Sequence, residues 1–203
     1  YNYGSTLLDL GRMDTAIEMF EKAIALNPSY AEAFNNLGVT FKELGQLDSA
    51  VKYYQKALDI KSDYAEAHNN LGLVFMNLGK LTSAAEHIEK ALKIRPDYAY
   101  ANNNYGSVLK QIGKFNASTK YYERALSINP DYFEAHNNLG NAFKYLKRHD
   151  ESLQSYQRSF ELKPDADYVL GNLIHSKLHL SNWSDLLVNI NELKVKIKNS
   201  KKT

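Results

Sequence analysis

The sequence of 203 residues contains no cysteine, only four prolines and no long hydrophobic run. Without cysteine the chain can form no disulfide or cysteine-ligated metal site, and it has no thiolate nucleophile. No apolar stretch approaches the roughly 20 residues that span a bilayer, and no signal-peptide pattern is seen at the start. We therefore expect a cytoplasmic protein in a reducing compartment, with no membrane partner.

The chain also has little excess of either sign of charge. Charged residues make up 24% of the chain and nearly cancel, leaving a net charge of +2. This balance argues against a nucleic-acid or membrane-surface binder. Five lysines fall in the last ten residues, and subtracting their charges from +2 leaves residues 1–193 at −3. We interpret the basic tail as a solvated helix end.

Patterns that carry catalysis are absent as well. Every glycine is isolated, so the chain has no glycine-rich phosphate loop. No spacing assembles a nucleophile, a base and an orienting partner. His175 and His179 could share a metal ion on one helix, but the sequence offers no third ligand at a suitable spacing. We expect no enzymatic activity in this chain, no cofactor and no metal.

A repeat of 34 residues is what the sequence does contain. The heptapeptide EAHNNLG occurs at 66–72 and 134–140, and EAFNNLG occurs at 32–38. Glycines keep the same step, at Gly4, Gly38, Gly72, Gly106 and Gly140. A fixed period of this length indicates stacked repeats rather than one globular core. Because the chain opens partway through a repeat, we interpret it as a fragment of a longer protein.

Each repeat reads as two helices. We number it so that position one is held by Ala31, Ala65, Ala99 and Phe133. Positions 3, 4, 7, 8, 10, 11 and 14 share one mostly apolar face of a first helix, which therefore packs. Gly45, Gly79 and Gly113 end that helix, and a second helix such as 47–60 follows. Proline closes the unit at Pro28, Pro96, Pro130 and Pro164, and Ser62 fills this position in one repeat.

This pattern resembles the tetratricopeptide repeat (TPR) family over residues 1–165. The family has Leu-Gly in the first helix, an aromatic residue three positions on, then a small residue, an aromatic residue and an alanine in the second helix, and a final proline. The repeat 31–64 matches with Leu37, Gly38, Phe41, Ala50, Tyr54, Ala57 and Ser62. The resemblance implies an all-α fold, a right-handed superhelix of antiparallel helix pairs whose first helices line the concave side.

The resemblance places a partial repeat at 1–30, full repeats at 31–64, 65–98 and 99–132, and a last one at 133–165. After Pro164 the recurring tyrosine is delayed to Tyr168, but two helices are still predicted. An apolar stripe there includes Trp183, Leu186, Leu187, Ile190, Leu193 and Ile197. We therefore expect residues 166–203 to form a degenerate helical pair that caps the solenoid.

The junction after the repeats carries a second resemblance. It is similar to that of bacterial relatives of protein O-linked N-acetylglucosamine transferases, on the segments Leu170-Gly171, His175-Ser176-Lys177 and Asn182-Trp183-Ser184-Asp185. Those proteins carry asparagine ladders that hold acceptor polypeptides, and their catalytic domain would follow Thr203. This resemblance implies an alternative function for the chain, the substrate-recognition arm of a glycosyltransferase.

Adjacent asparagines mark the face opposite the packing face, which must meet solvent or a ligand. An amide both donates and accepts, so a row of amides can pair with a peptide backbone without reading its side chains. The alternative is that the amides bond one another or cap carbonyls, in which case their replacement would lower stability. Position six holds Asn2, Asn36, Asn70, Asn104 and Asn138, and position five holds Asn35, Asn69, Asn103 and Asn137.

We expect a non-catalytic scaffold that binds an extended peptide or protein segment in the concave groove through this ladder. A clamp for a C-terminal carboxylate, which chaperone-binding TPR domains build from basic residues, is not expected because position two is mostly acidic. Histidines at position four are interpreted as packing residues, and lysines at position twelve as solvated charges. The residues concerned are Glu32, Glu66, Glu134, His68, His136, Lys42, Lys110 and Lys144.

One prediction concerns the end cap. We expect the side chain of Trp183 to be buried against the last regular repeat, so Trp183→Ala should lower the free energy of unfolding by about 3–5 kcal/mol. Thermal or chemical unfolding of the variant measures this loss. An unchanged melting profile would remove the cap assignment.

Overall fold

The computed structural model describes residues 4, 6, 8, 10–180, 190 and 191. The predicted rung Asn2, the predicted cap anchor Trp183 and the basic tail lie outside these described residues. No described helix is long and apolar enough to cross a membrane.

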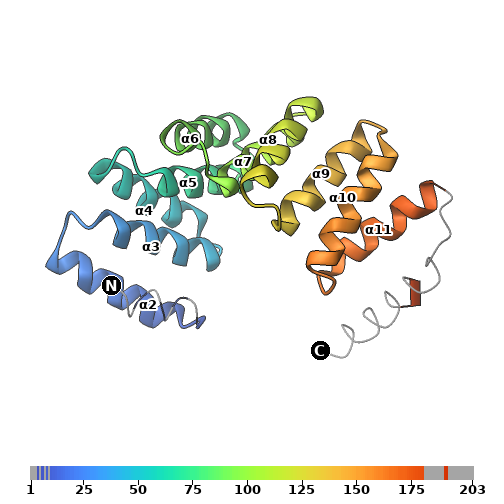
Figure 1. Cartoon of the computed structure of the whole chain (residues 1–203). Coiled ribbons are helices and arrows are strands. Elements are labelled where there is room, and N and C mark those ends of the chain that lie inside the picture. The colour runs from blue at the N-terminus through green and yellow to red at the C-terminus, as the bar shows by residue number, and fades with distance from the viewer. Residues whose placement is uncertain (1–3, 5, 7, 9, 181–189, 192–203) are drawn as a thin grey trace. The chain divides into compact units, whose positions relative to one another are not determined.

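The described part of the chain is all-α, as the repeat pattern predicts. Its ten helices, labelled in Figure 1, follow one another through short turns. They are α2 (Met13–Leu26), α3 (Ala31–Glu43), α4 (Leu47–Ile60), α5 (Ala65–Asn77), α6 (Leu81–Ile94), α7 (Ala99–Gln111), α8 (Phe115–Ile128), α9 (Phe133–Tyr145), α10 (His149–Leu162) and α11 (Asp167–His179).

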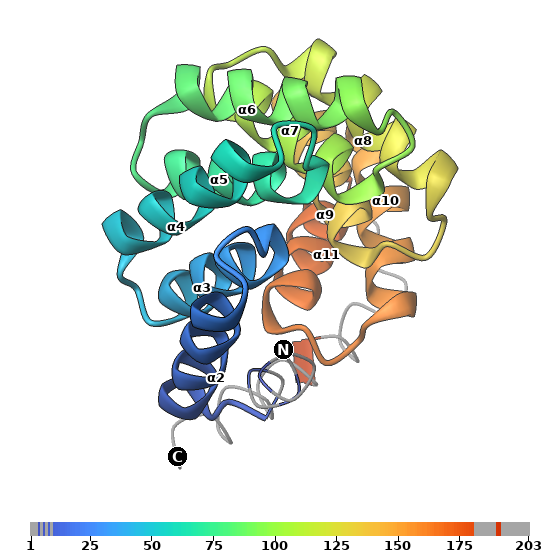
Figure 2. The same cartoon turned by 90° about the vertical axis from the view of Figure 1, so that its left-hand side faces the viewer.

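The chain divides inside α7 into two compact units, one formed by residues up to Asn104 and the other beginning at Tyr105. In the first unit α3 pairs with α4 and α5 with α6, while α4 also packs on α5. Figure 2 shows the same helices of the first unit from a second direction. In the second unit α8 packs on α9, α9 on α10, and α10 on α11. The prediction of an all-α solenoid of antiparallel helix pairs is confirmed.

Close contact between a glycine and a large side chain holds each pair together. A Cβ atom added to Gly38 would lie 2.6 Å from the ring of Tyr54, so only glycine lets α3 approach α4 this closely. Gly106 and Gly140 meet Tyr122 and Tyr156 in the same way. These tyrosines are almost wholly buried. The Leu-Gly and aromatic positions of the repeat are therefore two halves of one contact.

The hydroxyl groups of these buried tyrosines find their hydrogen-bond partners at position nine of the first helix, where that residue is polar. Tyr122 lies 3.2 Å from the hydroxyl of Ser107, and Tyr156 donates to the amide oxygen of Asn141 at 3.1 Å. In the repeat 31–64 this position is Val39, and the Tyr54 hydroxyl has no hydrogen-bond partner among the described residues. An apolar residue at position nine thus leaves the buried hydroxyl of Tyr54 unsatisfied.

The first helices end where the sequence predicts. Gly45, Gly79 and Gly113 have φ angles of 73°, 72° and 81°, in the left-handed region that favours glycine. The amide of Gly45 donates to the carbonyl of Lys42, and the amide of Gln46 donates to that of Phe41. Lys147 occupies the equivalent position in the repeat 133–166 with a φ of 59°.

The repeat register continues through α11, although the delayed Tyr168 suggested a departure. α11 begins at Asp167, one repeat length after Phe133, so position one is kept. Ile174 consequently stands at position eight, which is glycine in the earlier repeats. Gly171 lies at an open position, where an added Cβ atom would meet no other atom within 4 Å. Leu170 and Ile174 instead form a small apolar cluster with Phe160 and Ile190.

The two classes of helical glycine give a matched prediction. Gly38→Ala should lower the free energy of unfolding by about 1–3 kcal/mol, because the new methyl group collides with the Tyr54 ring. Gly171→Ala should raise it by about 0.5–1 kcal/mol, because alanine costs less backbone entropy than glycine in an open helical position. Urea unfolding of both variants measures the difference. Equal effects at the two sites would contradict the packing role of Gly38.

Candidate functional site

The position-five asparagines are buried, although the helical wheel predicts them on the solvent or ligand face. Their exposed fractions are 0% for Asn35, 2% for Asn69, 5% for Asn103 and 7% for Asn137. The wheel treats a helix alone, whereas the folded chain brings an asparagine of the following repeat against Asn35, Asn69 and Asn137. A buried amide must find hydrogen-bond partners.

The position-six asparagine of the following repeat supplies such a partner. Its side-chain amide nitrogen donates to the side-chain oxygen of the position-five asparagine before it. The two atoms are 3.2 Å apart for Asn70 and Asn35, 2.9 Å for Asn104 and Asn69, and 2.9 Å for Asn172 and Asn137. One amide pair therefore joins neighbouring repeats in each of these three places.

Asn172 is a rung that the sequence analysis missed. It lies one repeat length after Asn138, so the 34-residue step alone would have found it. The delayed Tyr168 suggested a departure from the repeat after Pro164, but α11 keeps the register.

Weaker amide contacts also connect the two asparagines within a repeat. The amide nitrogen of Asn35 lies 3.4 Å from the side-chain oxygen of Asn36 and 3.5 Å from a carboxylate oxygen of Glu66. The amide nitrogen of Asn103 lies 3.5 Å from the side-chain oxygen of Asn104. The asparagines thus form a chain of amides, with Glu66 at its edge.

The position-six side chains reach the solvent. Asn36, Asn70, Asn104, Asn138 and Asn172 are all partly exposed. An amide has two N–H donors and an oxygen with two lone pairs. Asn70 uses one N–H on Asn35, and no bond to its oxygen or second N–H is found among the described residues. The predicted ligand contact and the alternative of mutual bonding can therefore coexist in one side chain.

The charges beside the ladder differ from one another. Glu32 pairs with Lys61 at 3.6 Å, and Lys42 pairs with its neighbour Glu43 at 2.9 Å. Lys110 departs from the prediction of a solvated charge, since burial lowers its pKa. It lines a hollow of about 380 Å³ in the second unit together with Asn141 and the stacked rings of Phe115 and Tyr145. Positions 9, 12 and 13 of the ladder face contribute to this hollow.

Position four has a structural use that agrees with the packing interpretation. His68 is buried, and its Nε2 lies 3.1 Å from the carbonyl oxygen of Ser62. His136 makes the same contact with Pro130 at 2.9 Å, and Asn102 donates to Pro96 at 3.3 Å. A polar side chain at this position thus satisfies a carbonyl of the preceding turn.

The histidines of α11 lie close to one another and to a histidine of α10. The rings of His175 and His179 lie 4.7 Å apart, and His149 stacks on His179 at 5.6 Å. No group of three ligating side chains with metal-binding geometry is found in the part of the chain that the structure describes.

Comparisons with known proteins agree with this architecture. A family model described as TPR repeat matches residues 4–45, 40–79 and 106–147. A second model, described as tetratricopeptide repeat, matches residues 65–98 and 133–166. No curated protein matches the chain.

Solved structures share the fold at low sequence identity. The PilF protein of Pseudomonas aeruginosa has a TM-score of 0.86 at 20% identity, over 99% of this chain and 94% of that one. A thermophilic TPR protein of Thermus thermophilus, TTC0263, has a TM-score of 0.74 at 24% identity, over 87% and 96%. YrrB, described as a TPR protein with an unusual peptide-binding site, has a TM-score of 0.67 at 23% identity, over 92% and 100%. With the repeat models matching most of residues 4–166, the chain belongs to the tetratricopeptide repeat family.

Proposed function

We propose that this chain is a non-catalytic protein-interaction scaffold that holds an extended polypeptide along its position-six asparagines. The observation that carries the proposal is that the side-chain amide of Asn70 is only partly used in hydrogen bonds within the described part of the chain. One N–H of its amide is bonded to the buried Asn35, while the partly exposed side chain retains an oxygen and a second N–H. A peptide bond offers the complementary carbonyl and N–H.

Preorganisation supports this use of the ladder. A side chain that is already fixed loses little conformational freedom when a ligand binds, so more of each hydrogen bond remains as affinity. The bonds from Asn70 to Asn35 and from Asn104 to Asn69 fix two rungs in the first unit. The bond from Asn172 to Asn137 fixes one in the second.

The repeat spacing suits an extended ligand. Packed helices lie about 8–10 Å apart, and an extended chain advances about 3.3–3.6 Å per residue. Each rung would meet roughly every third residue of the peptide. Because the amides contact the backbone, side-chain selectivity falls to neighbouring groups, such as Glu66 and the hollow lined by Lys110 and Tyr145. YrrB, whose structure is described by its peptide-binding site, has the same fold.

The two ends of each amide bond provide a matched experiment. Peptides selected from a random library on the native chain serve as the probe. Asn70→Ala with Asn104→Ala removes two position-six amides, and Asn35→Ala with Asn69→Ala removes their buried partners. Both double variants break the same two hydrogen bonds and should lose stability. Only the first should weaken peptide binding directly, by about 0.5–1.5 kcal/mol for each bond made to the peptide.

Calorimetric titration at a temperature where all variants are folded separates binding from stability. The position-five variant should lose less affinity, only the part that preorganisation contributes, because Asn35 and Asn69 are themselves too buried to reach a ligand. A folded position-six variant with native affinity, or equal losses in the two variants, would contradict the proposal. Failure of the native chain to select any peptide would contradict it as well.

The alternative function is the substrate-recognition arm of a protein O-linked N-acetylglucosamine transferase-like enzyme. It makes the same use of the groove and is favoured by the rung at Asn172, which extends the ladder into the junction segment that resembles those enzymes. It predicts that the gene encodes a nucleotide-sugar transferase domain after Thr203. Sequencing the gene downstream of that codon tests this, and a different continuation would exclude it.

A further inference from the structure

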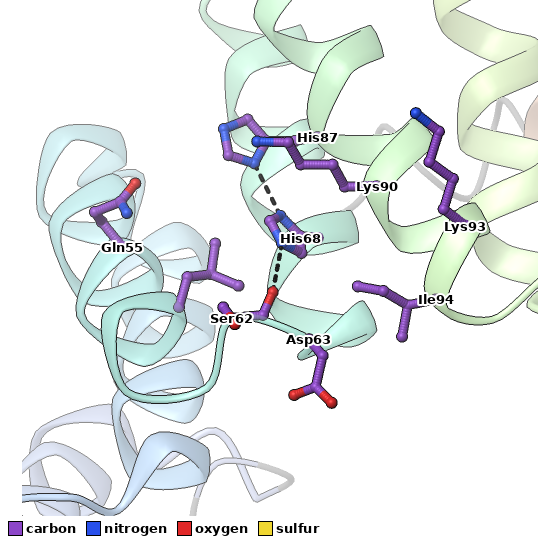
Figure 3. Close-up of a pocket in the computed structure, with 9 residues that line it drawn as sticks. Gln55, Ser62, Asp63, His68, His87, Lys90, Lys93 and Ile94 are labelled. Atoms are coloured by element: carbon purple, nitrogen blue, oxygen red, sulfur yellow. Dashed lines mark hydrogen bonds between the residues drawn. The ribbon is translucent and has the colours of Figure 1, made fainter.

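A pocket of about 580 Å³ lies in the first unit, apart from the ladder positions. Figure 3 shows its walls, which come from α4, the turn before α5, and helices α5 and α6. Two lysines of α6, Lys90 and Lys93, line it together with His87 and His68. The side chains of Leu58 and Ile94 add an apolar part. The pocket thus combines cationic groups with an apolar wall.

The two histidines form an ordered chain of hydrogen bonds. Nε2 of His68 lies 3.1 Å from the carbonyl oxygen of Ser62, which can only accept, so this nitrogen carries the proton. Nδ1 of neutral His68 is then an acceptor and receives the Nδ1–H of His87 at 3.1 Å. This leaves Nε2 of neutral His87 with a lone pair. A proton added there would break neither bond, because His87 would still donate through Nδ1.

At the equivalent positions in the second unit, the positive charge is neutralised by acidic side chains of the chain itself. Lys90 and Lys93 occupy positions 26 and 29, which are Arg158 and Glu161 in the repeat 133–166. Arg158 pairs with Glu161 at 3.3 Å and with Asp131 of the preceding turn at 2.9 Å. The positive charge of Arg158 is therefore compensated by two carboxylates of the chain itself.

The pocket in the first unit lacks this compensation. A lysine replaces the acid at position 29, and no ion pair of Lys90 or Lys93 is found among the described residues. Asp63 is the counterpart of Asp131, but Figure 3 shows its carboxylate pointing away from the two histidines. Two ammonium groups thus line a pocket whose only acidic lining residue is Asp63.

We propose that this pocket binds a phosphate monoester, with Lys90 and Lys93 on the phosphate oxygens, His87 donating from Nε2, and the organic group against Leu58 and Ile94. Charge selects the ligand. Two ammonium groups and a protonated His87 give three positive charges, and the carboxylate of Asp63 gives one negative charge. The resulting net charge of about +2 matches a phosphate dianion. The volume exceeds that of a phosphate alone, so an organic substituent is accommodated.

Binding is coupled to protonation of His87. In the free protein its pKa is lowered to about 4 by burial, by His68 and by Lys90. The charged groups that line the pocket with it are Lys90 and Lys93 on α6 and Asp63 in the turn, whereas α4 adds only uncharged side chains. A bound dianion raises the pKa of His87. Proton uptake on binding therefore follows, and the complex is favoured as pH falls from alkaline values toward neutrality.

Phenyl phosphate is a suitable probe, compared with inorganic phosphate and benzoate in calorimetric titrations of the whole chain near neutral pH. Phenyl phosphate should bind more tightly than either of the others. Its addition should move the nuclear magnetic resonance signals of the His87 ring toward those of an imidazolium. Weaker binding than benzoate, or an unchanged His87 ring on saturation, would overturn the assignment.

The variant Lys93→Glu restores the acid that Glu161 provides in the equivalent place. It should lower the affinity for phenyl phosphate about tenfold or more, because Lys90 gains an internal partner and the pocket loses a cation. Lys120→Glu makes the same change of charge on an exposed lysine of α8 and serves as the control. Equal losses in the two variants would show a general charge effect and overturn the site. Peptide binding along the ladder should be unchanged in both, which separates this proposal from the proposed function.

Discussion

The hydrogen bond between asparagines of successive repeats is the interaction on which the rest of this structure depends. It satisfies amides such as Asn35 and Asn69 that are removed from water, and a buried amide without a partner is costly. Because donor and acceptor belong to different repeats, the bond also fixes how one first helix lies against the next. The same bond orients the position-six amide, so the groove that we propose is a consequence of how the repeats are joined.

The two proposed sites use the repeat in opposite ways. The ladder depends on repetition, since the same amide recurs at the same position and can follow a peptide backbone over several turns. The proposed phosphate pocket depends on a departure from the repeat. At position 29 a lysine, Lys93, replaces an acid, and His68 forms a hydrogen bond with His87. A solenoid of this kind can thus combine a general surface with a specific one, because each repeat contacts mainly its neighbours.

Much of the fold follows from the sequence, because the 34-residue period places helices, turn glycines and Gly–Tyr contacts at known positions. The contacts at the candidate site could be predicted less well from the sequence. A helical wheel describes one helix, so it could not show that position five is covered by the next repeat or that Asn70 would reach Asn35. The burial of Lys110 likewise depends on neighbouring elements rather than on local pattern, whereas the register of α11 does follow from the 34-residue period.

A double-mutant cycle between Asn35 and Asn70 tests the central interaction most directly. The free energies of unfolding of the native chain, of Asn35→Ala, of Asn70→Ala and of the double variant give the coupling between the two side chains. The account predicts a favourable coupling of about 0.5–1.5 kcal/mol, the usual net contribution of such a hydrogen bond. Strictly additive effects, with no measurable coupling, would contradict it.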